Sequence, residues 1–133
     1  MGFFDLFSKR RDSPEAFYAL DSKIFPLRLL SHKNDSVDLV ITVKNVFDRS
    51  LLTSVLVRVP KSLGFDQTAL TSHKEIRLGE LPPNESKTLK IPVFSTQRTE
   101  PGTYKVRISV VSHYRDYGYV LNEVSKTTAL RAV

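Results

Sequence analysis

The sequence predicts an all-β protein, a single immunoglobulin-like antiparallel β-sandwich of about seven strands with a short N-terminal apolar arm. Apolar and polar side chains alternate in two runs, Leu89–Val93 and Tyr104–Val111, as expected of strands with one buried face. Turn residues precede both runs, Pro82-Pro83-Asn84 before the first and Pro101-Gly102 before the second. The body of the chain shows no helical periodicity, so we expect the strands to pack as two sheets.

Alternating or apolar segments separated by turn residues define the expected strands. They cover residues 15–30, 37–43, 52–59, 75–78, 89–93, 104–111 and 120–133. The first is expected to bend at Pro26, because proline is tolerated at sheet edges and bulges. The predicted core consists of Ile41, Val43, Leu56 or Val57, Ile91, Val106 and Ile108.

Three turn devices have a physical role of their own. Pro82-Pro83-Asn84 presets a turn, and Gly102 supplies the positive φ that the approach to the next strand requires. Tyr104 lies where a tyrosine corner would place its hydroxyl against upstream backbone. Val106 occupies the position of a disulfide cysteine in antibody domains, so packing is expected to replace that bridge.

These segments resemble the CARDB-like and related immunoglobulin-fold modules of archaea and bacteria. The resemblance covers roughly Val37 to Val111 and rests on VDLVITVKN, a strand ending in Pro60, LGELPPNESKTLKIPV and GTYKVRISVV. It implies a seven-stranded antiparallel sandwich with a binding or structural role. It carries over no catalytic residue, because each motif is a turn device and not a chemical site.

Length and composition indicate one globular domain. The chain has 133 residues, 41% of them hydrophobic, and we expect an arm and linker over 1–13 and the sandwich over 14–133. The absence of cysteine excludes disulfides, a thiol nucleophile and a cysteine zinc site. Neither a secretory signal nor an apolar run of about 18 residues is visible, so a cytoplasmic protein is expected, with the membrane periphery as an alternative location.

Enzymatic function is disfavoured. His32, His73 and His113 are far apart in sequence, each in or beside a predicted turn, and a metal or acid–base site would require them to converge with each other or with carboxylates. No glycine-rich phosphate loop, metalloprotease motif or nucleophile elbow is present. We therefore expect no catalytic residue, no metal and no cofactor.

The connection between the last two strands is the first candidate binding site. It carries Tyr114, Arg115, Tyr117 and Tyr119, and tyrosine offers a large contact area at a low entropic cost. In antibody domains the equivalent end loop performs recognition. The alternative is that one or two of the tyrosines fold back over the end of the sandwich while Arg115 pairs locally.

The N-terminal arm is the second candidate. Phe3, Phe4 and Phe7 would share one face of a helical turn, followed by the basic cluster Lys9-Arg10-Arg11. The arm either packs back on the sandwich or is an exposed anchor for a membrane interface or a partner groove. Myristoylation at Gly2 is disfavoured because Leu6 stands where a serine or threonine is expected.

The net charge of +6 makes nucleic acid and anionic lipid conceivable partners. Basic residues alternate with apolar ones along the strands, which predicts a solvated basic face and disfavours nucleic acid. The sequence therefore predicts a non-enzymatic protein-interaction module that binds a protein partner or itself through the tyrosine loop and the arm. The alternative is a peripheral membrane protein anchored by the arm.

Overall fold

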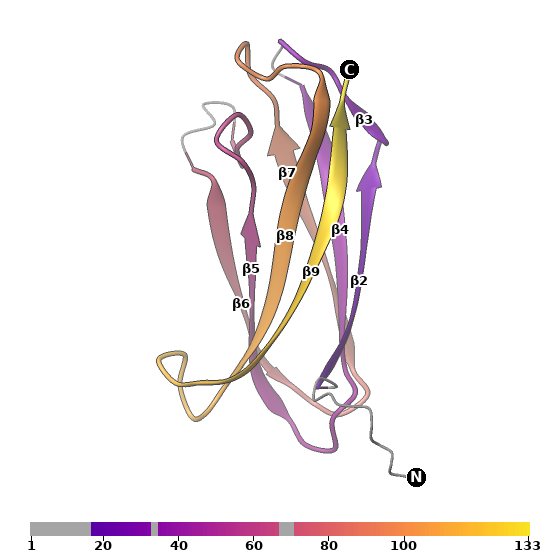
Figure 1. Ribbon diagram of the computed structural model, residues 1–133. Coiled ribbons are helices and arrows are strands. Elements are labelled where there is room, and N and C mark those ends of the chain that lie inside the picture. Colours follow the sequence, from indigo (N-terminus) through magenta and orange to yellow (C-terminus); the bar gives the residue numbers. More distant parts are fainter. Residues whose placement is uncertain (1–16, 33–34, 67–70) are drawn as a thin grey trace, which may run out of the picture.

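The computed structural model describes residues 17–32, 35–66 and 71–133. The named strands are β2 (Tyr18–Phe25), β3 (Arg28–Leu29), β4 (Ser36–Asn45), β5 (Leu51–Arg58), β6 (His73–Leu81), β7 (Ser86–Phe94), β8 (Gly102–His113) and β9 (Val120–Ala132). They form a three-stranded sheet in the order β2-β4-β7 and a five-stranded sheet in the order β3-β9-β8-β5-β6, packed as two layers (Figure 1). The predicted all-β immunoglobulin-like sandwich is confirmed.

The number of strands is eight among the described residues, where about seven were expected. The difference lies in the first predicted strand, which is two strands in two sheets. β2 pairs antiparallel with β4, whereas β3 pairs parallel with β9 through Arg28 opposite Arg131. Pro26, which has no N–H to donate to a ladder, lies in the turn between them, as the predicted bend required.

β6 is longer than the predicted strand at 75–78. It is an edge strand, and Ile76 and Leu78 are the half-buried apolar residues in its middle. Because most of their neighbours are charged, the alternation of apolar and polar residues is hard to recognise in the sequence. Its pairing with β5 shifts register between Thr53 and Ser54. Gly79 supplies a φ of +77° at this bulge, a conformation that glycine adopts without steric cost.

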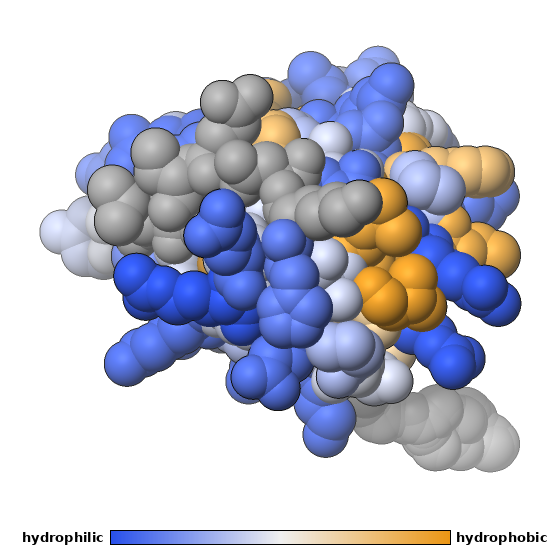
Figure 2. Space-filling model, turned by 90° about the horizontal axis from the view of Figure 1, so that it is seen from above, coloured by the Kyte–Doolittle hydropathy of each residue, from blue (hydrophilic) through white to orange (hydrophobic). Residues whose placement is uncertain are grey.

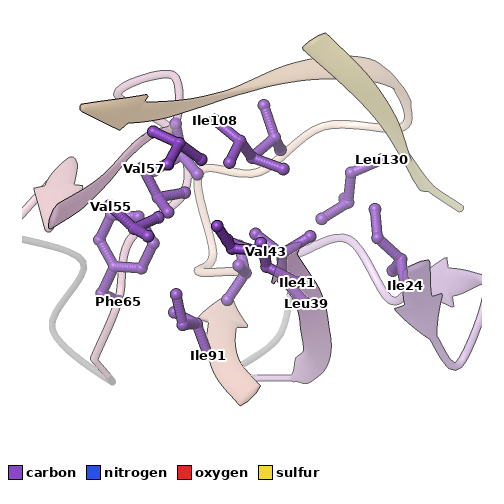
Figure 3. Close-up of a cluster of buried hydrophobic side chains, with 14 of the residues drawn as sticks. Ile24, Leu39, Ile41, Val43, Val55, Val57, Phe65, Ile91, Ile108 and Leu130 are labelled. Atoms are coloured by element: carbon purple, nitrogen blue, oxygen red, sulfur yellow. The ribbon is translucent and has the colours of Figure 1, made fainter. Parts of the chain in front are cut away.

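The core lies between the two sheets, where their inward side chains face each other (Figure 3). The predicted core residues are all buried, and the choice between Leu56 and Val57 is resolved in favour of Val57, which is fully buried while Leu56 is half-buried on the outer face. Branched aliphatic side chains dominate this layer, as fits strands that pack through one face. The fully buried aliphatic residues include Leu39, Ile41, Val43, Val55, Val57, Ile91, Ile108 and Leu130.

The predicted turn devices are present. The Tyr104 hydroxyl donates to the Glu100 carbonyl oxygen at 2.6 Å and accepts from the Glu100 N–H at 3.1 Å, which is the tyrosine corner. The Glu85 N–H donates to the Pro82 carbonyl at 3.2 Å and Asn84 has a φ of +67°, which closes the turn before β7. Gly102 has a φ of +155° at the start of β8.

We expect Ile108→Ala to lower the free energy of unfolding by about 2–5 kcal/mol, because it leaves a cavity in a fully enclosed site. Lys105→Ala, an exposed position of the same strand, should change it by less than about 0.5 kcal/mol. Denaturant unfolding measures both. A loss below about 1 kcal/mol at Ile108 would contradict the assigned inner face.

Candidate functional site

One end of the sandwich, called the hairpin end here, gathers the start of β2, the β4–β5 and β6–β7 connections and the β8–β9 hairpin (Figure 1). Asn45 organises it and is fully buried. Its Nδ2 donates to the carbonyl oxygens of Arg49 and Leu81 at 2.8 Å each, and its Oδ1 accepts from the Phe47 N–H at 2.7 Å. One side chain therefore holds two of these connections together.

Tyr18 and Thr53 add a second polar contact at the hairpin end, this one between the two sheets. The Tyr18 hydroxyl lies 2.8 Å from Thr53 Oγ1. Burial raises the pKa of Tyr18 above its ordinary value, while hydrogen bonds with Thr53 and Ser112 act in the opposite direction. The neutral phenol therefore links the sheets at this end.

The β8–β9 hairpin has a tight, internally bonded tip. The Tyr114 N–H donates to the Tyr119 carbonyl oxygen at 2.8 Å, and the Tyr119 N–H donates to the Asp116 carbonyl oxygen at 3.2 Å. Asp116 Oδ1 also accepts from the Gly118 N–H at 2.8 Å. Arg115 adopts a φ of +69°. The tip is therefore shaped by its own backbone and by one aspartate, as in an Asx-type turn.

Tyr117 folds back onto the outer face of the five-stranded sheet. The Gly79 N–H at the β6 bulge donates to its hydroxyl oxygen at 3.0 Å. The ring of His113 meets the tyrosine ring edge-on with centroids 5.0 Å apart, and the Arg77 guanidinium carbon lies 4.6 Å from the tyrosine ring centroid. Tyr117 was a predicted binding residue, and these contacts match the alternative in which a tyrosine covers the sandwich end.

Beside Tyr117, Ser54 and His113 form a buried pair. Ser54 Oγ lies 2.8 Å from His113 Nε2, and His113 Nδ1 is buried with no hydrogen-bond partner among the described residues. The two residues are 3% and 7% exposed, so a substrate has no access to the serine in this arrangement. The contact joins β5 to β8 beneath the folded-back tyrosine.

The remaining loop residues form an exposed surface, called the tyrosine tip here. Tyr114 and Tyr119 are 50% and 64% exposed, and Val120 and Leu121 beside them are 62% and 56% exposed. The guanidinium carbon of Arg115 lies 5.1 Å from the Tyr114 ring centroid, so the predicted local pairing of this arginine is with an aromatic ring.

Sequence reasoning missed Val120 and Leu121 as surface residues, because an apolar pair at the start of a strand was assigned to the sandwich. The ladder pairs His113 with Val120 and Ser112 with Asn122, leaving Leu121 as an extra residue. This irregularity explains why two consecutive apolar side chains are both exposed. Two apolar residues in a row directly after Tyr119 were the available signal.

The predicted arm residues Phe3, Phe4 and Phe7 lie outside the described residues. The first described residue, Phe17, is half-buried and stacks on Phe47, with ring centroids 4.3 Å apart and an interplanar angle of 27°. This stack belongs to the hairpin end, which is also the end of the tyrosine tip.

The three histidines have separate surroundings. His32 Nδ1 lies 3.1 Å from the Gln97 carbonyl oxygen, His113 contacts Ser54, and His73 is exposed opposite Arg58. Within residues 17–32, 35–66 and 71–133, no group of three or more His, Cys, Asp or Glu residues is placed to hold a metal ion. No helix in that part of the chain is long and apolar enough to cross a membrane.

Comparison with solved structures identifies the fold. The native Escherichia coli α2-macroglobulin fragment from domain MG7 to the C-terminus matches 90% of this chain with a TM-score of 0.62 and 16% identity. The CARDB domain of a Pyrococcus furiosus protein, solved in complex with di-metal ions, matches 96% of this chain and 98% of its own, with a TM-score of 0.55 and 19% identity. The fold is that of CARDB-like immunoglobulin modules.

The CARDB-like resemblance predicted from the strand and turn motifs is confirmed at the level of the fold. A third match is AvmM, described as catalysing macrocyclization in alchivemycin A biosynthesis, which covers 88% of this chain and 89% of its own with a TM-score of 0.59 and 8% identity. The chain spans 17% of the macroglobulin fragment. No protein-family profile and no curated protein matches the sequence.

We expect Tyr117→Phe to lower the free energy of unfolding by about 1 kcal/mol, because the Gly79 N–H loses its acceptor. Tyr117→Ala should cost more, since the ring contacts with His113 and Arg77 disappear as well. Tyr119→Ala, at an exposed site of the same loop, should stay within about 0.5 kcal/mol of the parent. Equal effects at positions 117 and 119 in denaturant unfolding would show that Tyr117 is not a structural cap.

Proposed function

We propose that this CARDB-like sandwich is a non-enzymatic protein-interaction module that recognises a protein partner through the tyrosine tip. The observation that carries the proposal is the exposure of Tyr114 and Tyr119 at 50% and 64%, beside Val120 and Leu121, on a hairpin fixed by its own hydrogen bonds. A preorganised loop loses little conformational entropy on binding. Exposed aromatic anchors on such a loop are typical of recognition surfaces.

The chemistry of the tip favours a protein partner. Its charged residues, Arg115 and Asp116, balance each other, so it offers apolar and aromatic area with a neutral polar rim. The folded-back Tyr117 supports the proposal indirectly, because it fixes the hairpin against β6 and leaves the other two tyrosines to solvent. Recognition is therefore assigned to Tyr114, Tyr119, Val120 and Leu121, with Arg115 stacked on Tyr114.

We expect Tyr114→Ser combined with Tyr119→Ser to weaken partner binding at least roughly tenfold, as loss of two interface anchors does, with an unchanged unfolding midpoint. A photo-reactive phenylalanine analogue at position 119 should cross-link the full-length chain to one discrete protein in extract of the native cell. Affinity of the purified pair is then measured by calorimetry.

The matched control carries the photo-reactive group at Lys87, an exposed position of β7 in the other sheet. If cross-linking from positions 87 and 119 gives the same products, the tip has no specific partner. A double tyrosine variant that binds as tightly as the parent would also refute the proposal. If cross-linking yields a dimer of the chain itself, the recognised partner is a second copy.

A second candidate function, peripheral membrane association through the arm, is supported by the position of Phe17. Phe17, the first described residue, lies in the stack with Phe47 at the hairpin end, the end that also carries the tyrosine tip. The sequence Lys9-Arg10-Arg11 adds attraction to anionic lipid of about 1 kcal/mol per basic residue near the membrane.

Deleting residues 1–12 separates the two roles of the arm. If the arm is an anchor, we expect unchanged cooperative unfolding together with lost self-association or weakened binding to anionic vesicles, measured by ultracentrifugation and vesicle flotation. If the arm instead belongs to the core, the truncated chain should be markedly less stable, with the same self-association and lipid binding as the full chain.

A further inference from the structure

The end of the sandwich opposite the hairpin carries a second exposed apolar surface, called the apolar corner here. Phe25 and Leu27 are 65% and 77% exposed, and Leu30 and Val133 are 46% and 41% exposed. Viewed from above, apolar side chains gather on the side of this end where β2, β3 and the last residues of β9 lie (Figure 2). Exposed apolar patches of this kind mark interaction sites.

A basic band adjoins the apolar corner on the outer face of the five-stranded sheet. Its members are exposed residues of four neighbouring strands: Arg28 on β3, Arg131 on β9, Lys105 and Arg107 on β8, and Arg58 on β5. The alternation places Arg28 and Arg131 outward, because Leu29 and Ala132 beside them are buried. Leu30 lies two positions after Arg28, and Val133 lies two positions after Arg131. By the same alternation, both point to the side of the sheet that carries the arginines.

The band is under electrostatic strain in the protein alone. Arg28 lies directly opposite Arg131, and Arg58 lies directly opposite Arg107. Like charges in directly opposed positions destabilise a sheet. Within the described residues none of the band's five cations is in an ion pair. An external array of anions would relieve this repulsion.

We propose that the apolar corner and the basic band together dock on an anionic lipid membrane, with Leu27 and Leu30 entering the interface and the band contacting lipid phosphates and carboxylates. The combination of an apolar corner with a basic band favours a membrane over other anionic partners. Nucleic acid would complement the band but leave the aliphatic corner in water, whereas a bilayer offers both an anionic surface and an apolar layer beneath it. This surface is distinct from the tyrosine tip, which lies at the other end of the sandwich.

A hollow of about 310 Å³ lies at the far end of the basic band and is lined by Arg58, Val59, Ser72 and His73. Arg58 connects it to Arg107 across the β5–β8 pair. The cationic surface therefore extends from the β3 edge to β5, beside the β6 edge of the sheet. A membrane contacting the corner would meet charge along four of the five strands.

The experiment uses the full chain and vesicles of phosphatidylcholine alone or mixed in equal parts with phosphatidylserine, compared by co-sedimentation. We expect binding to the mixed vesicles and much weaker binding to phosphatidylcholine. Arg28→Glu with Arg131→Glu should weaken binding at least roughly tenfold, since each surface arginine contributes about fivefold. Leu27→Ser combined with Leu30→Ser should weaken binding to the mixed vesicles, and also binding to phosphatidylcholine vesicles if the parent binds them measurably.

Matched controls lie elsewhere on the same molecule. Lys44→Glu with Lys87→Glu makes the same change in charge on the three-stranded sheet, and Val46→Ser removes exposed apolar area at the hairpin end. Both should bind the mixed vesicles like the parent. The unfolding midpoint of each variant verifies that it is folded.

A tryptophan reporter tests the orientation, because the chain contains no tryptophan of its own. Leu27→Trp should show a blue-shifted emission on mixed vesicles, and Leu121→Trp should not. The proposal fails if the arginine variant binds like the parent, if the deletion of residues 1–12 alone abolishes binding, or if the band binds an oligonucleotide while the mixed vesicles remain unbound.

Discussion

The apolar packing of two sheets against each other, made without any covalent bridge, is the constraint from which the rest of this structure follows. The chain has no cysteine, and the fully buried Val106 occupies the position where antibody domains place a disulfide cysteine. Inward positions of β4, β5, β7 and β8 are therefore committed to tightly packed branched aliphatic residues. Any one-residue slip of a strand would exchange its inner and outer faces, so the register is strongly specified.

Because the core occupies the inward positions, the outward positions and the two ends of the sandwich are available for other roles. The polar interactions are concentrated where strands end. At the hairpin end, Asn45 bonds two connections and Tyr117 ties the hairpin to the bulge at Gly79. At the other end, the Tyr104 hydroxyl bonds the backbone of Glu100, and the turn from β2 to β3 carries the chain from one sheet to the other.

The strands that could be predicted from sequence are those with one clearly apolar face. β4, β7 and β8 alternate over their central residues, and proline or glycine marks the turns before β7 and β8, so their positions and inner faces were predictable. β6 was underestimated because an edge strand buries few apolar side chains. The division of the first strand into β2 and β3 depends on which sheet each part joins, a tertiary choice that local alternation does not encode.

The three tyrosines of the loop show that local sequence patterns are limited in the same way at the candidate site. Tyr114, Tyr117 and Tyr119 are the same residue type in one loop, yet of the three only Tyr117 accepts a hydrogen bond from a backbone N–H of another strand. That N–H is available because β6 bulges at Gly79, 38 residues earlier in the sequence. The acceptor and its donor belong to different hairpins, so no local pattern pairs them. In such a loop, the side chains that the fold uses for its own contacts are not available for binding. The side chains that remain exposed are those that can contact a partner.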